Sequence, residues 1–135
     1  MKFKSKDIAI IITTSGSKNI YKVLNSIKGQ SKKVGKIIVI SNVKNFNYPL
    51  KNLRFFFTQK KNQVYQRILA KKFIKKKTKI ILQLDDYVLL HKNAIEQLII
   101  NWNTSGEKIA GIGMVPTNYE LPKTNLIQKI LLTNS

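Results

Sequence analysis

The sequence contains no cysteine, two arginines and six acidic residues, beside 23 lysines. Because cysteine is missing, disulfide bonds and thiolate metal sites are excluded, and a cytoplasmic setting is permitted. Long apolar runs are also missing. The apolar stretch nearest the N-terminus, residues 8–12, is too short for the core of a signal peptide or for a membrane span.

The net charge of +19 comes almost entirely from lysine. A basic surface attracts phosphate backbones, so a lysine-rich nucleic-acid-binding module is one interpretation. A dedicated reader of phosphates or bases usually contains more arginine, whose guanidinium binds bidentately. Because Lys, Ile and Asn are all favoured by A/T-rich codons, we interpret the charge as a compositional bias that adds weak attraction to anionic surfaces. Nucleic acid is therefore the less favoured partner.

Segments with the patterns of strands and helices alternate along the chain. With 135 residues, 43% of them hydrophobic, the chain is expected to form one domain over residues 1–135. Strands are predicted over residues 7–13, 36–41, 54–58, 79–84 and 109–115, and helices over residues 19–28, 62–75 and 93–102. Residues 42–52 are expected to form a loop, and residues 116–135 an irregular tail or a loose helix over 121–132. This order predicts an α/β fold with a mainly parallel sheet flanked by helices.

Each predicted helix has one apolar face, with residues spaced for successive turns. The residues expected to face inward are Ile20, Val23, Leu24 and Ile27 in the first helix, Val64, Ile68, Leu69 and Phe73 in the second, and Ala94, Ile95, Leu98, Ile99 and Trp102 in the third. The three successive phenylalanines at residues 55–57 are expected to pack against both faces of the sheet.

Asp85 and Asp86 are adjacent and directly follow residues 79–84, which we interpret as a buried strand. Ligands of open α/β sheets bind at the carboxyl ends of strands. A carboxylate pair at such a strand end suits a hard divalent cation and the phosphates that it carries. The alternative is that the pair forms a turn and an N-cap ahead of the next helix.

The ordered segments resemble the family 2 glycosyltransferases, which are nucleotide-sugar enzymes with the GT-A fold, similar to the Rossmann fold. Residues 8–14, an apolar strand with a threonine turn, are similar to the family's opening, and residues 82–95 are similar to its metal-binding region. Between them, residues 61–63 and Arg67 resemble an Asn-rich turn and an Arg-bearing helix. The resemblance covers residues 7–115 and depends on the order of these partial matches.

The resemblance implies that the chain binds a nucleotide-diphosphate sugar through Mg²⁺ or Mn²⁺. Asp85 and Asp86 would be the metal ligands, and the residues expected to line the nucleotide site are Thr13, Thr14, Ser15, Ser41, Asn42, Arg67 and Asp85. Two positions depart from the family pattern. The second strand ends in Ser41 and Asn42 where an Asp is usual, and Tyr87 stands where a further Asp usually completes the metal motif.

The resemblance also implies transfer of a hexosyl group to a glycan or lipid-linked acceptor. Such enzymes usually serve cell envelope polysaccharide synthesis, so we expect a cytoplasmic protein, peripheral to the inner face of the membrane. The family's acceptor side and catalytic base normally lie beyond the length of this chain, so a donor-binding part, truncated after the metal region, is expected. Glu96, Glu107 and Glu120 do not suit a general base. A catalytically inactive remnant or a partner-dependent subunit is therefore the second interpretation.

Overall fold

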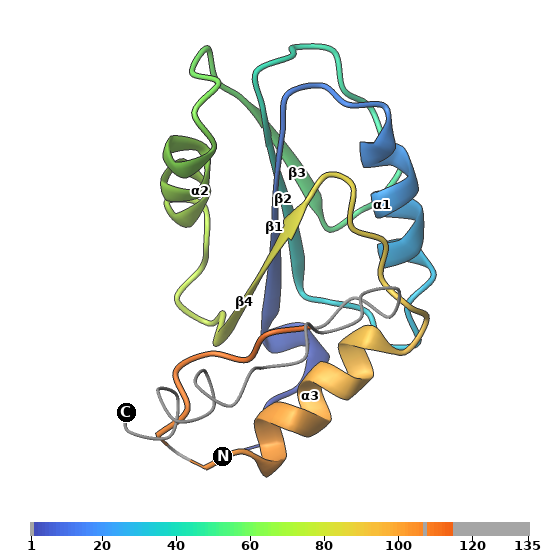
Figure 1. Cartoon of the computed structure of the whole chain (residues 1–135), viewed down its shortest axis with the longest axis vertical. Coiled ribbons are helices and arrows are strands. Elements are labelled where there is room, and N and C mark those ends of the chain that lie inside the picture. Colours follow the sequence, from blue (N-terminus) through green and yellow to red (C-terminus); the bar gives the residue numbers. More distant parts are fainter. Residues whose placement is uncertain (1, 107, 115–135) are drawn as a thin grey trace, which may run out of the picture.

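The computed structural model describes residues 2–106 and 108–114, which form a parallel four-stranded sheet with helices on both faces (Figure 1). The elements are a short 3-10 turn η1 (Ser5–Asp7), the strands β1 (Ile8–Thr14), β2 (Lys36–Ser41), β3 (Leu53–Phe57) and β4 (Ile80–Asp85), and the helices α1 (Asn19–Lys28), α2 (Gln63–Lys71) and α3 (Ala94–Thr104). The predicted α/β sheet flanked by helices is confirmed, and so is the loop between β2 and β3.

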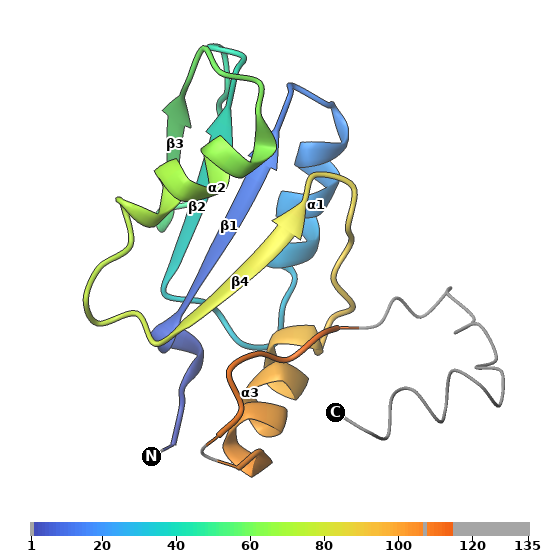
Figure 2. The ribbon, with the colours of Figure 1, turned by 60° about the vertical axis from the view of Figure 1, so that its left-hand side comes forward.

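The strands follow the order β3-β2-β1-β4 across the sheet (Figure 2). The chain first moves outward from β1 to β2 and β3, and α2 then connects β3 to β4 on the other side of β1. The direction of winding therefore changes between β1 and β4. In open α/β sheets, ligands bind outside the carboxyl ends of the strands at such a switch point.

The sheet is buried on two faces by different helices. On one face, Ile20, Val23, Leu24 and Ile27 of α1 are buried as predicted and form one core cluster with β1. On the other face, Ala70 of α2 packs with residues of β1 and β2. β2 is buried along residues 37–41, as expected of a parallel strand covered on both sides. The phenylalanines of β3 divide between the faces as predicted, because Phe55 joins the first cluster and Phe56 the second.

Helix α2 differs from its prediction in length and in its inner face. It ends at Lys71 and not near residue 75, and Phe73, beyond the end of the helix, stacks on Phe56. Val64 and Ile68 were expected to face inward, but they are 63% and 59% exposed. The buried positions of this helix are Gln66 and Ala70, with Leu69 partly buried.

Two strand predictions also need correction. β4 is buried on one face only, because α2 covers β1 and β2 but leaves Ile81 of β4 44% exposed. Residues 109–114 form no strand; Gly111 and Gly113 weaken strand pairing there, and Ile112 packs against the core without joining the sheet. Residue 115 and the expected helix over 121–132 lie outside the described residues. Among those that are described, no helix is long and apolar enough to cross a membrane.

Candidate functional site

Polar residues from three strands meet at the carboxyl edge of the sheet, at the switch point between β1 and β4. The strand register pairs Thr13 with Asp85, and Thr14 with Ser41. Thr13, Thr14 and Ser41 are buried, and Asn42 follows Ser41 directly. The structure therefore brings together the residues that the sequence placed at separate strand ends.

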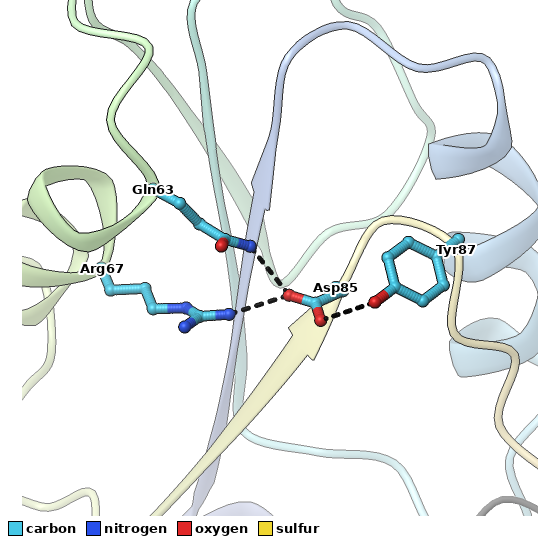
Figure 3. Close-up of polar contacts among 4 residues, drawn as sticks. All are labelled: Gln63, Arg67, Asp85 and Tyr87. Carbon is cyan, nitrogen blue, oxygen red and sulfur yellow. Dashed lines mark hydrogen bonds and ion pairs between the residues drawn. The ribbon is translucent and has the colours of Figure 1, made fainter.

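Asp85 accepts hydrogen bonds from three side chains (Figure 3). Its Oδ1 atom accepts from Arg67 Nη2 at 2.8 Å and from Gln63 Nε2 at 2.9 Å. Its Oδ2 atom accepts from the Tyr87 hydroxyl at 3.2 Å. Both oxygens of this carboxylate are thus engaged, and the charge of Asp85 is balanced by Arg67.

Helix α2 positions two of these donors. Gln63 and Arg67 are one turn apart on the same helix face, and both side chains extend toward Asp85 (Figure 3). Asn62 caps the helix by accepting from the backbone N–H of Tyr65, and buried Gln66 donates to the carbonyl of Lys60. The start of α2 is therefore fixed against the loop that follows β3. Gln63 was not predicted as a site residue, although its i, i+4 spacing from Arg67 was visible in the sequence.

Asp86 faces a different partner from Asp85. Its Oδ2 atom accepts from the Thr14 hydroxyl at 2.5 Å, and Thr14 Oγ1 in turn accepts from the backbone N–H of Gly16 at 3.1 Å. Each of the two adjacent carboxylates thus has its own donors, which offsets their mutual repulsion. Residues 86–87 form a turn, as the alternative interpretation held, but they do not cap α3, which begins at Ala94 after Asn93.

The loop after β1 completes this edge of the sheet. Gly16 has φ of +92°, and a Cβ atom there would lie 2.5 Å from Val43 Cγ2, so this turn requires glycine. Ser15 is exposed in the turn. Ser41 Oγ accepts from the backbone N–H of Val43 at 3.0 Å, which ties the loop after β2 to the same edge.

The charges of the site change the acidity of Tyr87. The hydrogen bond that its phenol donates to Asp85, together with the negative charge of that carboxylate, raises the pKa of Tyr87 above its ordinary value of 10.0. Tyr87 stands at the position where the pattern of the family 2 glycosyltransferases usually has an Asp. In the structure it serves as a neutral donor to Asp85 instead.

The residues present would suit a cation that is coordinated only in part by the protein. Among the described residues, no group of three or more His, Cys, Asp or Glu could hold a metal ion. Asp85 and Asp86 could supply two carboxylates, which matches Mg²⁺ in sites where water and substrate phosphates complete the coordination. Thr13 Oγ1 and Asn42 Oδ1 are buried at the same edge, with no hydrogen-bond partner in the described part of the chain.

Comparison with known proteins agrees with the fold. No curated protein matches the chain. Residues 8–125 match the model of the glycosyl transferase family 64 domain. This match supports the glycosyltransferase class predicted from the sequence, but under family 64 and not specifically family 2. Because the match covers most of the 135 residues, the chain belongs to the glycosyl transferase family 64 domain family.

Proposed function

We propose that the domain binds a nucleotide-diphosphate sugar at the carboxyl ends of β1, β2 and β4 and transfers the sugar to a glycan or lipid-linked acceptor. The observation that carries this proposal is the convergence of Asp85, Asp86 and Thr14 at the switch point of a glycosyltransferase-family sheet. The nucleoside side of this donor site would be formed by the residues at the ends of β1 and β2, which are Thr13, Thr14, Ser15, Ser41 and Asn42.

The reaction requires stabilisation of the leaving diphosphate, whose negative charge grows as the glycosidic bond breaks. Mg²⁺ or Mn²⁺, held by Asp85 and Asp86, would supply Lewis acidity toward the phosphate oxygens. Arg67 offers the second positive charge. Its guanidinium carries five N–H donors, and the contact with Asp85 engages Nη2, so the same side chain can also donate to a phosphate.

Glu96 does not serve as the catalytic base in this proposal. Its carboxylate lies 3.7 Å from Lys32 Nζ and accepts from Ser31 Oγ at 3.2 Å, in contacts with the segment that follows α1. Glu107 and Glu120 lie outside the described residues. The proposal therefore assigns donor binding to named side chains and leaves the catalytic residues unassigned.

Calorimetric titration of UDP and GDP, with Mn²⁺ and then with EDTA, tests the donor site. We expect binding that needs the metal and is weakened at least about tenfold by Asp85→Asn or Asp86→Asn, which is ~1.4 kcal/mol. Glu96→Gln is the matched control, because it removes an acid from another part of the fold. If nucleotide binding persists in EDTA, attraction of the phosphates by lysine side chains explains it. If no nucleotide binds in either condition, the interpretation as a catalytically inactive remnant is favoured.

A further inference from the structure

A concave site lies at the edge of the sheet opposite the candidate donor site. It is a cavity of about 170 Å³ whose lining includes four cationic side chains, Lys36, Lys51, Arg54 and Lys75. Lys36 begins β2, whereas Ser41 ends it at the candidate donor site. Five residue steps along a strand correspond to about 16 Å, so the two sites lie at separate ends of the sheet.

The four cations converge from different segments of the chain. Lys36 and Arg54 belong to neighbouring strands, Lys51 lies in the turn before β3, and Lys75 follows α2. Lys36 Nζ donates to the carbonyl of Phe73 at 2.8 Å, which holds the ammonium group in place. The backbone N–H of Ile37 donates to the carbonyl of Asn52, which ties the start of β2 to the turn before β3.

None of the four cations that line the cavity forms a salt bridge within the described part of the chain. The described residues form salt bridges between Lys32 and Glu96 and between Arg67 and Asp85, and neither pair lines the cavity. Burial lowers the pKa of Lys36, and the charges of Lys75 and Arg54 lower it further. The ammonium of Lys36 therefore experiences the positive field of its neighbours.

We propose that this cavity binds a phosphate group, presented either by a free phosphate or by a phospholipid headgroup. Four cations around one small cavity repel each other, and an anion within it would relieve that repulsion. A doubly charged phosphate offsets more of this charge than a carboxylate does. The guanidinium fork of Arg54 and the rotatable donors of the lysines match its oxygens, and Thr78 is a further lining residue of the same cavity.

Inorganic phosphate is titrated into the protein in the presence of EDTA, and the amide NMR signals are monitored. Because EDTA removes divalent metal, this experiment tests the proposal independently of the metal-dependent donor site. We expect saturable shifts at Gly35 and Asn52, and binding weakened about tenfold or more in the double variant Arg54→Gln, Lys75→Gln. The control is Lys22→Gln, Lys92→Gln, which removes the same charge from exposed positions elsewhere. Thermal melting establishes that both double variants are folded.

Equal weakening in the two double variants would overturn the proposal, because it would show an effect of net charge alone. Shifts spread over the exposed lysines without saturation would also overturn it. Co-sedimentation with phosphatidylcholine vesicles, with and without phosphatidic acid, distinguishes the sources of phosphate. Binding that needs phosphatidic acid and is lost only in the cavity variant assigns the lipid headgroup. If phosphate binding is saturable but vesicle binding is the same in the cavity variant and the control, the ligand of the cavity is a free phosphate.

Discussion

At the scale of single residues, Asp85 is the group on which the account of the site depends. Its carboxylate is about one-third exposed and lies 2.8 Å from a guanidinium that is also about one-third exposed. A cation that binds Asp85 must share the carboxylate with Arg67 or replace it. Arg67 is therefore expected to oppose metal binding in the free protein and to support phosphate binding when a donor is present.

The substitution Arg67→Gln separates these two effects. Without nucleotide, we expect Mn²⁺ to bind up to about fivefold more tightly, which corresponds to ~1 kcal/mol for a partly exposed ion pair. With Mn²⁺ present, UDP should bind more weakly, because one phosphate donor is lost. Calorimetry measures both affinities, and Lys92→Gln, at an exposed position outside both sites, is the control. An unchanged Mn²⁺ affinity in Arg67→Gln would show that the cation does not use Asp85.

The ionisation of Tyr87 reports directly on Asp85. Because the raised pKa of Tyr87 arises first from its hydrogen bond to Asp85, Asp85→Asn should lower this pKa toward 10.0. The stability that this hydrogen bond contributes is present below pH 10 and is lost as the pH rises through the raised pKa. The difference in phenolate absorbance between the protein and its Tyr87→Phe variant measures the titration. The hydrogen bond would be refuted by a Tyr87 pKa that stays the same in Asp85→Asn.

Gly16 provides a test of the loop that supports Asp86. Gly16→Ala places a Cβ against Val43 at a φ of +92°, so we expect a loss of about 1–3 kcal/mol in the free energy of unfolding. Chemical denaturation measures this loss. Gly106→Ala is the matched control, because a Cβ there meets nothing within 4 Å. Equal stability of the two variants would contradict the described turn.

At the scale of elements, α1 and α2 differ in the burial of their apolar residues, although both helices have apolar residues at similar spacing. Leu24 of α1 is fully buried, whereas Ile68 of α2 is 59% exposed. Leu24→Ala should therefore cost about 2–5 kcal/mol of unfolding free energy, and Ile68→Ala less than about 0.5 kcal/mol. Denaturant unfolding measures both. A large loss in Ile68→Ala would mean that α2 packs through the face predicted from its periodicity.

The success of the sequence interpretation differed between elements for physical reasons. β1 and β2 were predicted well because their unbroken apolar runs are buried on both faces, and α1 because its apolar residues are buried where helical periodicity places them. The face of α2 was predicted in part: Leu69 and Phe73 pack against the core as expected, whereas Val64 and Ile68 do not. Gln66, a polar residue, takes a buried position of this helix through its bond to the Lys60 carbonyl. The one-sided burial of β4 depends on how far α2 extends over the sheet, and local sequence does not contain that information.

The candidate site was predictable in its location and only partly in its contacts. Thr13, Thr14, Ser41 and Asp85 all end parallel strands, and such ends meet at one edge of a sheet. The donors to Asp85 were harder to predict. Gln63 precedes Asp85 by 22 residues, and its contact depends on the position of α2.

At the scale of the whole molecule, the acidic pair and the cation-lined cavity lie at opposite edges of the sheet. Asp85 and Asp86 lie at the carboxyl edge, and Lys36, Lys51, Arg54 and Lys75 lie around the cavity at the other edge. A net charge of +19 alone would spread cations without a pattern. The grouping of the acids at the switch point is what favours a donor site there over general attraction of anions.

The most direct test of this donor site is paramagnetic broadening of amide NMR signals by Mn²⁺ and UDP, with Mg²⁺ and UDP as the diamagnetic reference. We expect the amide signals of Thr14, Gly16 and Asp86 to be lost first, while Gly35 at the opposite edge keeps its intensity. Broadening that begins at Gly35, or that leaves Asp86 unaffected, would contradict a metal-dependent nucleotide site at the carboxyl end of the sheet.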